Sequence, residues 1–203
     1  MSIPRLLVDI DGVLADFNPS YVEMLNKVSG RRVPTPEQPW PTAWSYEESL
    51  GFTKAEISAA WKEITSKGVD FWYNLPSLPG ADDFIDHLNE VVESALAEVY
   101  FVTSRPGWDV KVQTEMWLYE RGMDIATVIP ITWSKGVVAK ALGITHAIDD
   151  KPDNCEDILL HTGRLCQTTL YAQPYNVAER EGLLRKGCPT RSSLEEWLKE
   201  SLA

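Results

Sequence analysis

The chain has 203 residues, of which 44% are hydrophobic and 24% are charged, and its net charge is −11. These values are typical of a soluble globular protein, and the length fits one large domain or a core domain with a smaller insert. An acidic surface repels phosphate backbones, so the composition disfavours broad nucleic-acid binding and argues against a polynucleotide partner.

The chain also lacks the sequence features of a membrane or secreted protein. No apolar stretch reaches the ~20 residues of a membrane span, and Asp9 and Asp11 break the N-terminal apolar run that a signal peptide would need. The cysteines Cys155, Cys166 and Cys188 have no metal-type spacing, which predicts buried thiols. Thiols persist in a reducing cytosol, so we expect a cytoplasmic protein without a membrane partner, and a homodimer stays open.

Short apolar runs alternate with helical patterns along most of the chain. Buried strands are predicted at residues 5–10, 98–103, 127–131, 145–148 and 165–171. Helices are predicted at residues 81–96, 109–121, 135–142, 154–161 and 193–202. Strands that alternate with helices predict an α/β protein with three α/β/α layers, a Rossmann-like core around a parallel sheet.

Residues 18–78 interrupt this alternation. They contain two helical patterns, at 20–29 and 53–66, with a stretch rich in proline and tryptophan between them. We interpret the segment as a small helical cap inserted after the first strand. The core domain is then formed by residues 1–17 and 79–203.

Two acids follow the first predicted strand. Asp9 and Asp11 stand two residues apart at its end, and Gly12 indicates that the chain turns there. Two carboxylates at one strand end repel each other unless a cation lies between them, and oxygen ligands of this kind suit Mg²⁺. The alternative interpretation is a solvated pair of acids at a strand-to-turn junction.

Hydroxyl and basic side chains follow two other predicted strands. Thr103, Ser104 and Arg105 end the second strand, where hydroxyls and an arginine fork can hold phosphate oxygens. A hydroxyl-rich turn explains the same residues. Lys135 begins a predicted helix, an unfavourable place for a cation unless an anion lies nearby, although most lone lysines are surface charges.

A second acidic pair follows the fourth predicted strand. Asp149 and Asp150 can supply the metal ligand that Asp9 and Asp11 lack. For Asp153 and Asn154 we favour a simpler role, the N-cap of the next helix. Because parallel strands present their carboxyl ends at one edge of the sheet, all these residues are expected at a common site.

This set of motifs resembles the haloacid dehalogenase superfamily of phosphotransferases over nearly the whole chain. The four motifs of that superfamily map onto Asp9 with Asp11, Thr103, Lys135, and Asp149 with Asp150. A narrower resemblance, to the 5′(3′)-deoxyribonucleotidase family, rests on residues 11–17, 75–81, 148–152 and 173–176. That family usually has arginine where Lys151 stands.

The resemblance implies an Mg²⁺-dependent phosphatase that forms an aspartyl-phosphate. Asp9 would attack phosphorus, and Asp11 would serve as acid and then as base. The metal ligands would be Asp9, the backbone carbonyl of Asp11, and Asp149 or Asp150. Thr103 and Lys135 would bind the transferred phosphoryl oxygens, with Ser104 and Arg105 assisting.

The aromatic residues of the cap bear on the substrate. Phe17, Trp44, Trp61 and Trp72 are expected to form a pocket that stacks on a base, which favours a (deoxy)ribonucleoside monophosphate. These rings could instead form the core of the cap. Three further functions stay open: a phosphatase of a sugar phosphate or similar metabolite, a nucleic-acid 3′-end phosphatase, and a non-catalytic phosphate binder.

Overall fold

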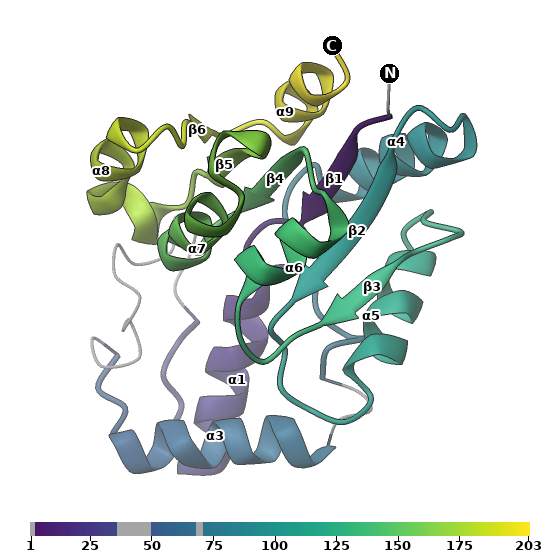
Figure 1. The fold of residues 1–203 in the computed structure, drawn as a ribbon. Helices are drawn as coiled ribbons and strands as arrows, with labels where there is room; N and C mark the ends of the chain where they lie inside the picture. Colours follow the sequence, from purple (N-terminus) through teal and green to yellow (C-terminus); the bar gives the residue numbers. More distant parts are fainter. Residues whose placement is uncertain (1–2, 36–49, 68–70) are drawn as a thin grey trace.

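The computed structural model describes residues 3–35, 50–67 and 71–203 (Figure 1). Its six strands form one parallel sheet in the order β3-β2-β1-β4-β5-β6. The strands are β1 Arg5–Val8, β2 Glu98–Thr103, β3 Val128–Pro130, β4 His146–Asp149, β5 Gln167–Tyr171 and β6 Thr190–Arg191. The predicted α/β fold with a parallel sheet is confirmed.

Helices cover both faces of the sheet (Figure 1). In β1, Leu6 and Val8 belong to one buried cluster, which also includes residues of α4 and α9, whereas Leu7 belongs to a second cluster with residues of α6 and α7. Alternating side chains of a strand point to opposite faces, so the continuous apolar run of β1 serves both layers. The core helices are α4 Ala81–Glu93, α5 Val110–Tyr119, α6 Lys135–Leu142, α7 Pro152–Thr162, α8 Arg180–Arg185 and α9 Leu194–Ser201.

Two further helices follow β1 in the chain, α1 Phe17–Ser29 and α3 Lys54–Lys67. They pack against each other, and α3 begins with a capping box: the Thr53 amide donates to the Glu56 carboxylate at 2.7 Å, and the Glu56 amide donates to the Thr53 hydroxyl at 3.3 Å. Both helices were predicted from their periodicity. The division of the chain into a core domain and a cap stays a prediction.

The structure differs from the sequence prediction at a few places. β1 ends at Val8 rather than at residue 10, because the Ile10 carbonyl accepts hydrogen bonds from Leu14 and Ala15 and thereby closes a turn. Gly12 lies in this turn with a φ of +83°, a conformation that favours glycine. β6 and α8 were missed because a two-residue strand and a six-residue helix carry too little periodicity.

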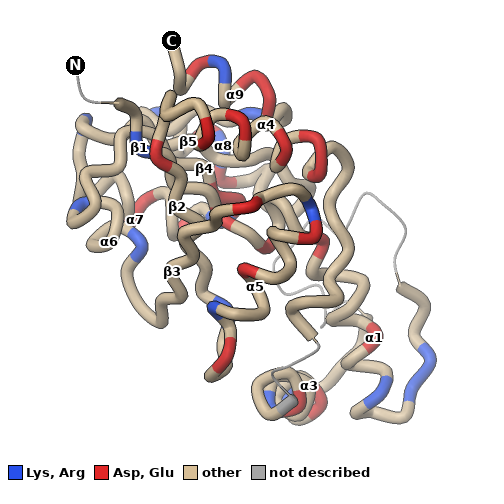
Figure 2. Tube along the Cα trace, turned by 90° about the vertical axis from the view of Figure 1, so that its right-hand side faces the viewer, with Lys and Arg blue, Asp and Glu red and all other residues tan. Residues whose placement is uncertain are grey.

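The structure also shows where the acidic side chains lie and whether the cysteines are paired. Acidic side chains gather on α4 and α9 at one side of the molecule (Figure 2). The cysteines Cys155, Cys166 and Cys188 are buried and free, which confirms the prediction of buried thiols. Among the described residues, none of the helices has the length and hydrophobicity that crossing a membrane requires.

Candidate active site

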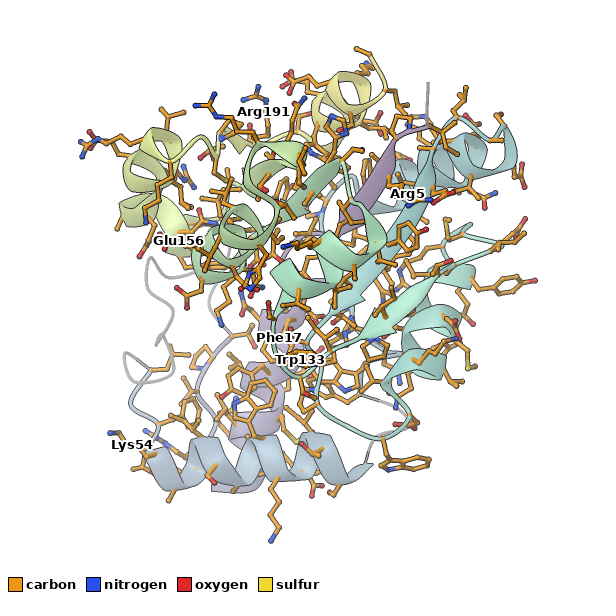
Figure 3. The ribbon with its side chains drawn as sticks, in the orientation of Figure 1. Arg5, Phe17, Lys54, Trp133, Glu156 and Arg191 are labelled. Atoms are coloured by element: carbon orange, nitrogen blue, oxygen red, sulfur yellow. The ribbon has the colours of Figure 1, made fainter. Side chains whose placement is uncertain are left out.

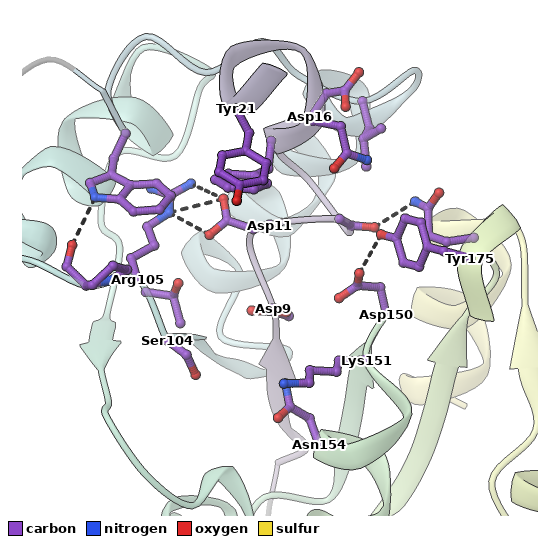
Figure 4. A pocket seen from close by; sticks show the side chains of 18 of the residues that line it. Asp9, Asp11, Asp16, Tyr21, Ser104, Arg105, Asp150, Lys151, Asn154 and Tyr175 are labelled. Carbon is purple, nitrogen blue, oxygen red and sulfur yellow. Dashed lines mark hydrogen bonds and ion pairs between the residues drawn. The ribbon is translucent and has the colours of Figure 1, made fainter. Parts of the chain in front are cut away.

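A cavity of about 290 Å³ lies at the carboxyl ends of the central strands (Figure 4). It brings together most of the predicted site residues. These are Asp9, Asp11, Thr103, Ser104, Arg105, Lys135 and Asp150 from the core, and Phe17, Trp61 and Trp72 from the predicted cap pocket. Asp149 is fully buried and does not line the cavity, and Trp44 lies outside the described residues.

A buried lysine joins two of the acids. The Lys135 ammonium lies 2.7 Å from an Asp9 carboxylate oxygen and 2.6 Å from one of Asp149. Burial alone would lower the pKa of Lys135, but the Asp149 and Asp9 carboxylates more than offset it and hold that pKa above its ordinary value. Lys135 is therefore a fixed cation beside the predicted nucleophile.

The start of α6 explains how a lysine occupies this position. Ser134 is the N-cap and accepts a hydrogen bond from the Val137 amide at 3.0 Å. The Gly136 amide donates to the Asp157 carboxylate at 2.8 Å, so an acid of α7 complements the positive end of the helix. A side chain at Gly136 would collide with the Asp157 carbonyl, at 2.2 Å, so the two helices meet closely here.

Asp149 is held by α7 on its other side. Asn154 donates to both Asp149 oxygens at 3.0 and 3.1 Å, and the Lys151 amide donates to one of them at 2.8 Å. Our prediction that Asp153 or Asn154 caps α7 was wrong: the N-cap is Lys151, with Pro152 at the first helical position. Pro152 has no backbone N–H that needs a cap, so the Asn154 side chain is available to donate to Asp149.

Asp150 has a different environment. The Tyr175 hydroxyl donates to one Asp150 oxygen at 2.5 Å, and the Asn176 side chain donates to the Asp150 carbonyl at 2.8 Å. The same loop reaches the first motif, because Gln173 donates to the Gly12 carbonyl at 2.7 Å. A Cβ at Gly12 would lie 2.2 Å from Asp150 and 2.6 Å from Tyr175, so the turn after β1 fits only glycine.

Three buried acids could hold a metal ion. One carboxylate oxygen from each of Asp9, Asp149 and Asp150 lies within 4.8 Å of the others. Asp149 uses both its oxygens in hydrogen bonds, whereas Asp9 and Asp150 each keep one oxygen without a partner among the described residues. Two carboxylates of one cluster that each keep a free oxygen, a ligand type that Mg²⁺ prefers, fit a divalent cation.

The electrostatics of the cluster lead to the same conclusion. Burial, and then the charge of Asp149, raises the pKa of Asp9 to about 7. The same two causes raise the pKa of Asp150 well above its ordinary value. Lys135 supplies one positive charge for three carboxylates, so a bound divalent cation would favour their ionised forms.

Tyr175 should therefore matter for metal affinity. We expect Tyr175→Phe to weaken Mg²⁺ binding about 10-fold, because outer-shell partners of metal ligands typically have effects of this size. Isothermal titration with Mg²⁺ measures it. Tyr171→Phe is the matched control, since Tyr171 is a partly buried tyrosine that does not line the cavity. Unchanged affinity in Tyr175→Phe would mean that Asp150 does not depend on this hydrogen bond.

Thr103 is the last residue of β2 and lines the cavity. Its oxygen is buried and has no hydrogen-bond partner among the described residues, and Thr103 itself is 1% exposed. Leaving a buried hydroxyl without a hydrogen-bond partner costs free energy, so a Thr103 hydroxyl in the same cavity as Asp9 and Lys135 points to an anionic ligand oxygen. Ser104, the next residue, is exposed and also lines the cavity.

Arg105 does not point its donors toward an open anion site. Its guanidinium binds the Asp11 carboxylate, with Nε at 2.9 Å and Nη2 at 2.7 Å, and Nη1 donates to Thr114 at 2.9 Å (Figure 4). This pair could not be predicted from the sequence, because 94 residues separate Arg105 from Asp11.

Aromatic rings line another part of the cavity. The Phe17 ring is nearly parallel to Trp61 and Trp72, with centroid distances of 5.7 and 5.9 Å. Tyr21, a cavity residue that sequence reasoning missed, stacks on Phe17 at 5.0 Å. Figure 3 places Phe17 between the sheet and α3, and its ring lines the same cavity as Asp9 and Asp150.

Comparison with known proteins identifies the fold. No protein-family model and no curated protein sequence matches this chain. A haloacid dehalogenase-like family hydrolase from Streptococcus pneumoniae is 16% identical, with a TM-score of 0.63 over 98% of each chain. A predicted phosphatase from Clostridium acetobutylicum is 15% identical, with a TM-score of 0.63 over 99% of each. A candidate β-phosphoglucomutase from Thermotoga maritima is 17% identical, with a TM-score of 0.56 over 98% of each.

Proposed function

We propose that this chain, which has the fold of haloacid dehalogenase-like hydrolases, is an Mg²⁺-dependent phosphomonoester hydrolase. The observation that carries the proposal is that Asp9, Lys135 and Thr103 line one cavity: the buried Lys135 ammonium lies 2.7 Å from Asp9, and the Thr103 hydroxyl has no partner among the described residues. A carboxylate nucleophile, a fixed cation and a free hydroxyl are what phosphoryl transfer needs, because its main task is to position and stabilise charged oxygens.

In the first step, an Asp9 oxygen forms a bond to phosphorus while the bond to the leaving oxygen breaks. The leaving oxygen takes the proton of the Asp11 carboxyl group and departs as an alcohol. In the second step, water attacks phosphorus, its proton passes to the Asp11 carboxylate, and the bond to Asp9 breaks. The products are inorganic phosphate and a regenerated Asp9.

Lys135 and Thr103 are assigned to the phosphoryl oxygens, with Ser104 at the mouth of the cavity. Asp9 and Asp150 would hold Mg²⁺ through their free oxygens, together with the Asp11 carbonyl, and Asp149 would position Lys135. When bound, the metal offsets the repulsion between the Asp9 carboxylate and the phosphate.

For the substrate we favour a (deoxy)ribonucleoside monophosphate. The rings of Phe17, Trp61 and Trp72 supply a stacking surface beside the phosphate subsite, and such stacking contributes about 1–3 kcal/mol per base. The acidic residues of α4 and α9, and the net charge of −11, argue against a nucleic-acid end as substrate. The buried free thiols fit an enzyme of the reducing cytosol.

A sugar phosphate is the second candidate. The fold likeness to a candidate β-phosphoglucomutase favours it, since that name implies a phosphorylated sugar. The test is phosphate release from deoxyribonucleotides, ribonucleotides and sugar phosphates, with Mg²⁺ and with EDTA. Faster release from nucleotides would support base stacking on the aromatic rings, and faster release from sugar phosphates would argue against a nucleotide substrate. No release from any substrate would contradict phosphatase activity.

Phe17 gives a sharper test of the substrate class. We expect Phe17→Ala to raise KM for a nucleotide about 10-fold, since the loss of one stacking contact costs roughly 1–3 kcal/mol, and to change KM for a small phosphate ester little. Steady-state kinetics with both substrates measures it. Phe71→Ala is the matched control, because Phe71 contacts Phe17 edge-on but does not line the cavity. Equal effects on both substrates would argue against stacking.

A further inference from the structure

We propose that Arg105 is the positioning residue of the Asp11 carboxylate rather than a phosphate ligand. The inference rests on the proposed function, in which Asp11 is the acid and base. Nε of Arg105 contacts both Asp11 oxygens, at 3.2 and 2.9 Å, and Nη2 contacts one of them at 2.7 Å. A guanidinium fork that engages both oxygens of a carboxylate fixes its orientation as well as its place.

Every nitrogen of the guanidinium already donates to a protein group, which leaves only the second N–H of each terminal nitrogen. Nε and Nη2 are used by Asp11, and Nη1 donates to the fully buried hydroxyl of Thr114 on α5. The arginine side chain itself is 0% exposed. The phosphate subsite, by contrast, already has Lys135 and the unpartnered hydroxyl of Thr103.

Arg105 is fixed from its other side by an aromatic ring. Its guanidinium carbon lies 5.0 Å from the ring centroid of Trp72, and the Trp72 indole donates to the Pro106 carbonyl at 3.2 Å. A cation over an indole face is held by the ring's electrostatic field. Trp72 also stacks near Phe17, so one connected set of contacts joins the acid to the substrate-facing rings.

Asp11 needs such a partner because of where it stands. It follows the end of β1, outside the sheet ladder, and its side chain is 25% exposed in the cavity. An aspartate there can rotate about two single bonds, and a misplaced acid contributes little to proton transfer. The fork of Arg105 holds the carboxylate in one orientation relative to Asp9.

The chemical consequence depends on the leaving group. An alkyl phosphate must receive a proton as its alkoxide departs, whereas 4-nitrophenolate departs readily without one. A variant that only misplaces Asp11 therefore loses rate with an alkyl ester and keeps most of it with an aryl ester. A variant that loses a phosphate ligand loses rate with both esters alike.

The test is Arg105→Lys, assayed with an alkyl phosphate and with 4-nitrophenyl phosphate. We expect kcat/KM for the alkyl ester to fall about 100-fold, which is within the range that general acid catalysis contributes. For the aryl ester we expect kcat/KM to fall less than about 10-fold. Because Asp11 also activates water in the second step, we expect the variant to release a burst of 4-nitrophenol about equal to the enzyme concentration.

Two further variants keep the test decisive if Arg105→Lys fails to fold. Thr114→Val removes only the Nη1 acceptor and should give the same pattern with smaller losses. In an Asp11→Asn background, Arg105→Lys should cause no further loss with the alkyl ester. The control is Arg121→Lys, because Arg121 also lies over a tryptophan ring, at 4.0 Å, but donates to Ser77, Trp117 and Leu75 and not to Asp11, so both rates should stay unchanged.

The outcomes separate the two proposals. A wild-type enzyme that hydrolyses neither ester would contradict the phosphatase itself. If the wild type is active and Arg105→Lys loses activity equally with both esters, or adds its loss to that of Asp11→Asn, then Arg105 binds phosphate and its positioning role is overturned.

Discussion

Asp9→Asn should reduce kcat by about 10⁴-fold or more, because an amide oxygen is a poor nucleophile and no other carboxylate can replace it. Both oxygens of Asp149 are hydrogen-bonded, and Asp150 bonds Tyr175 through one oxygen while its other oxygen is assigned to the metal. Phosphate release with the best substrate of the panel measures the loss.

The fold of Asp9→Asn should remain intact. Lys135 keeps its contact with Asp149 at 2.6 Å, and the substitution removes one negative charge from a crowded buried cluster. Without metal, the melting temperature is therefore expected to equal or exceed that of the wild type. Asp153→Asn is the control, an exposed acid that follows the Asp149–Asp150 pair and should retain full activity. Turnover by Asp9→Asn near the wild-type rate would remove Asp9 as nucleophile.

Removal of divalent metal has the second large expected effect. We expect EDTA to abolish turnover, and saturating Mg²⁺ to raise the melting temperature. Binding at 100 times Kd stabilises the folded state by about 2.7 kcal/mol, which for a chain of this size corresponds to roughly 5–10 °C. Thermal unfolding with and without Mg²⁺ measures the shift.

The matched variant for the metal effect is Asp150→Asn. It removes the free oxygen of Asp150 and should abolish most of the Mg²⁺-induced rise in melting temperature. Tyr175 can still hydrogen-bond to the amide oxygen, so the fold should tolerate the change. An Mg²⁺ shift that survives in Asp150→Asn, or phosphatase activity that survives EDTA, would argue against a metal site at these carboxylates.

The sequence predicted the fold and the composition of the site because both follow from local patterns. Continuous apolar runs marked the long strands, and polar residues at their ends marked the edge of the sheet. Asp9, Thr103, Lys135 and Asp150 were expected at one site, and all four line one cavity. They come together because parallel strands present their carboxyl ends at the same edge of the sheet.

The contacts between the site residues could not be predicted, because they join positions far apart in the chain. Tyr175 lies 25 residues from Asp150, and Arg105 lies 94 residues from Asp11. Asn154 was misread as a cap because asparagine near a helix start is usually one. Only the three-dimensional position of Asp149 reveals its actual partner.

The central claim is that Asp9 carries the phosphoryl group during turnover. The most direct measurement is rapid acid quench of the enzyme with ³²P-labelled substrate, followed by peptide mapping. We predict one labelled peptide that contains Asp9, loses its label with hydroxylamine, and is unlabelled in Asp9→Asn. Label on another residue, or turnover without a labelled enzyme at any quench time, would contradict the proposed mechanism.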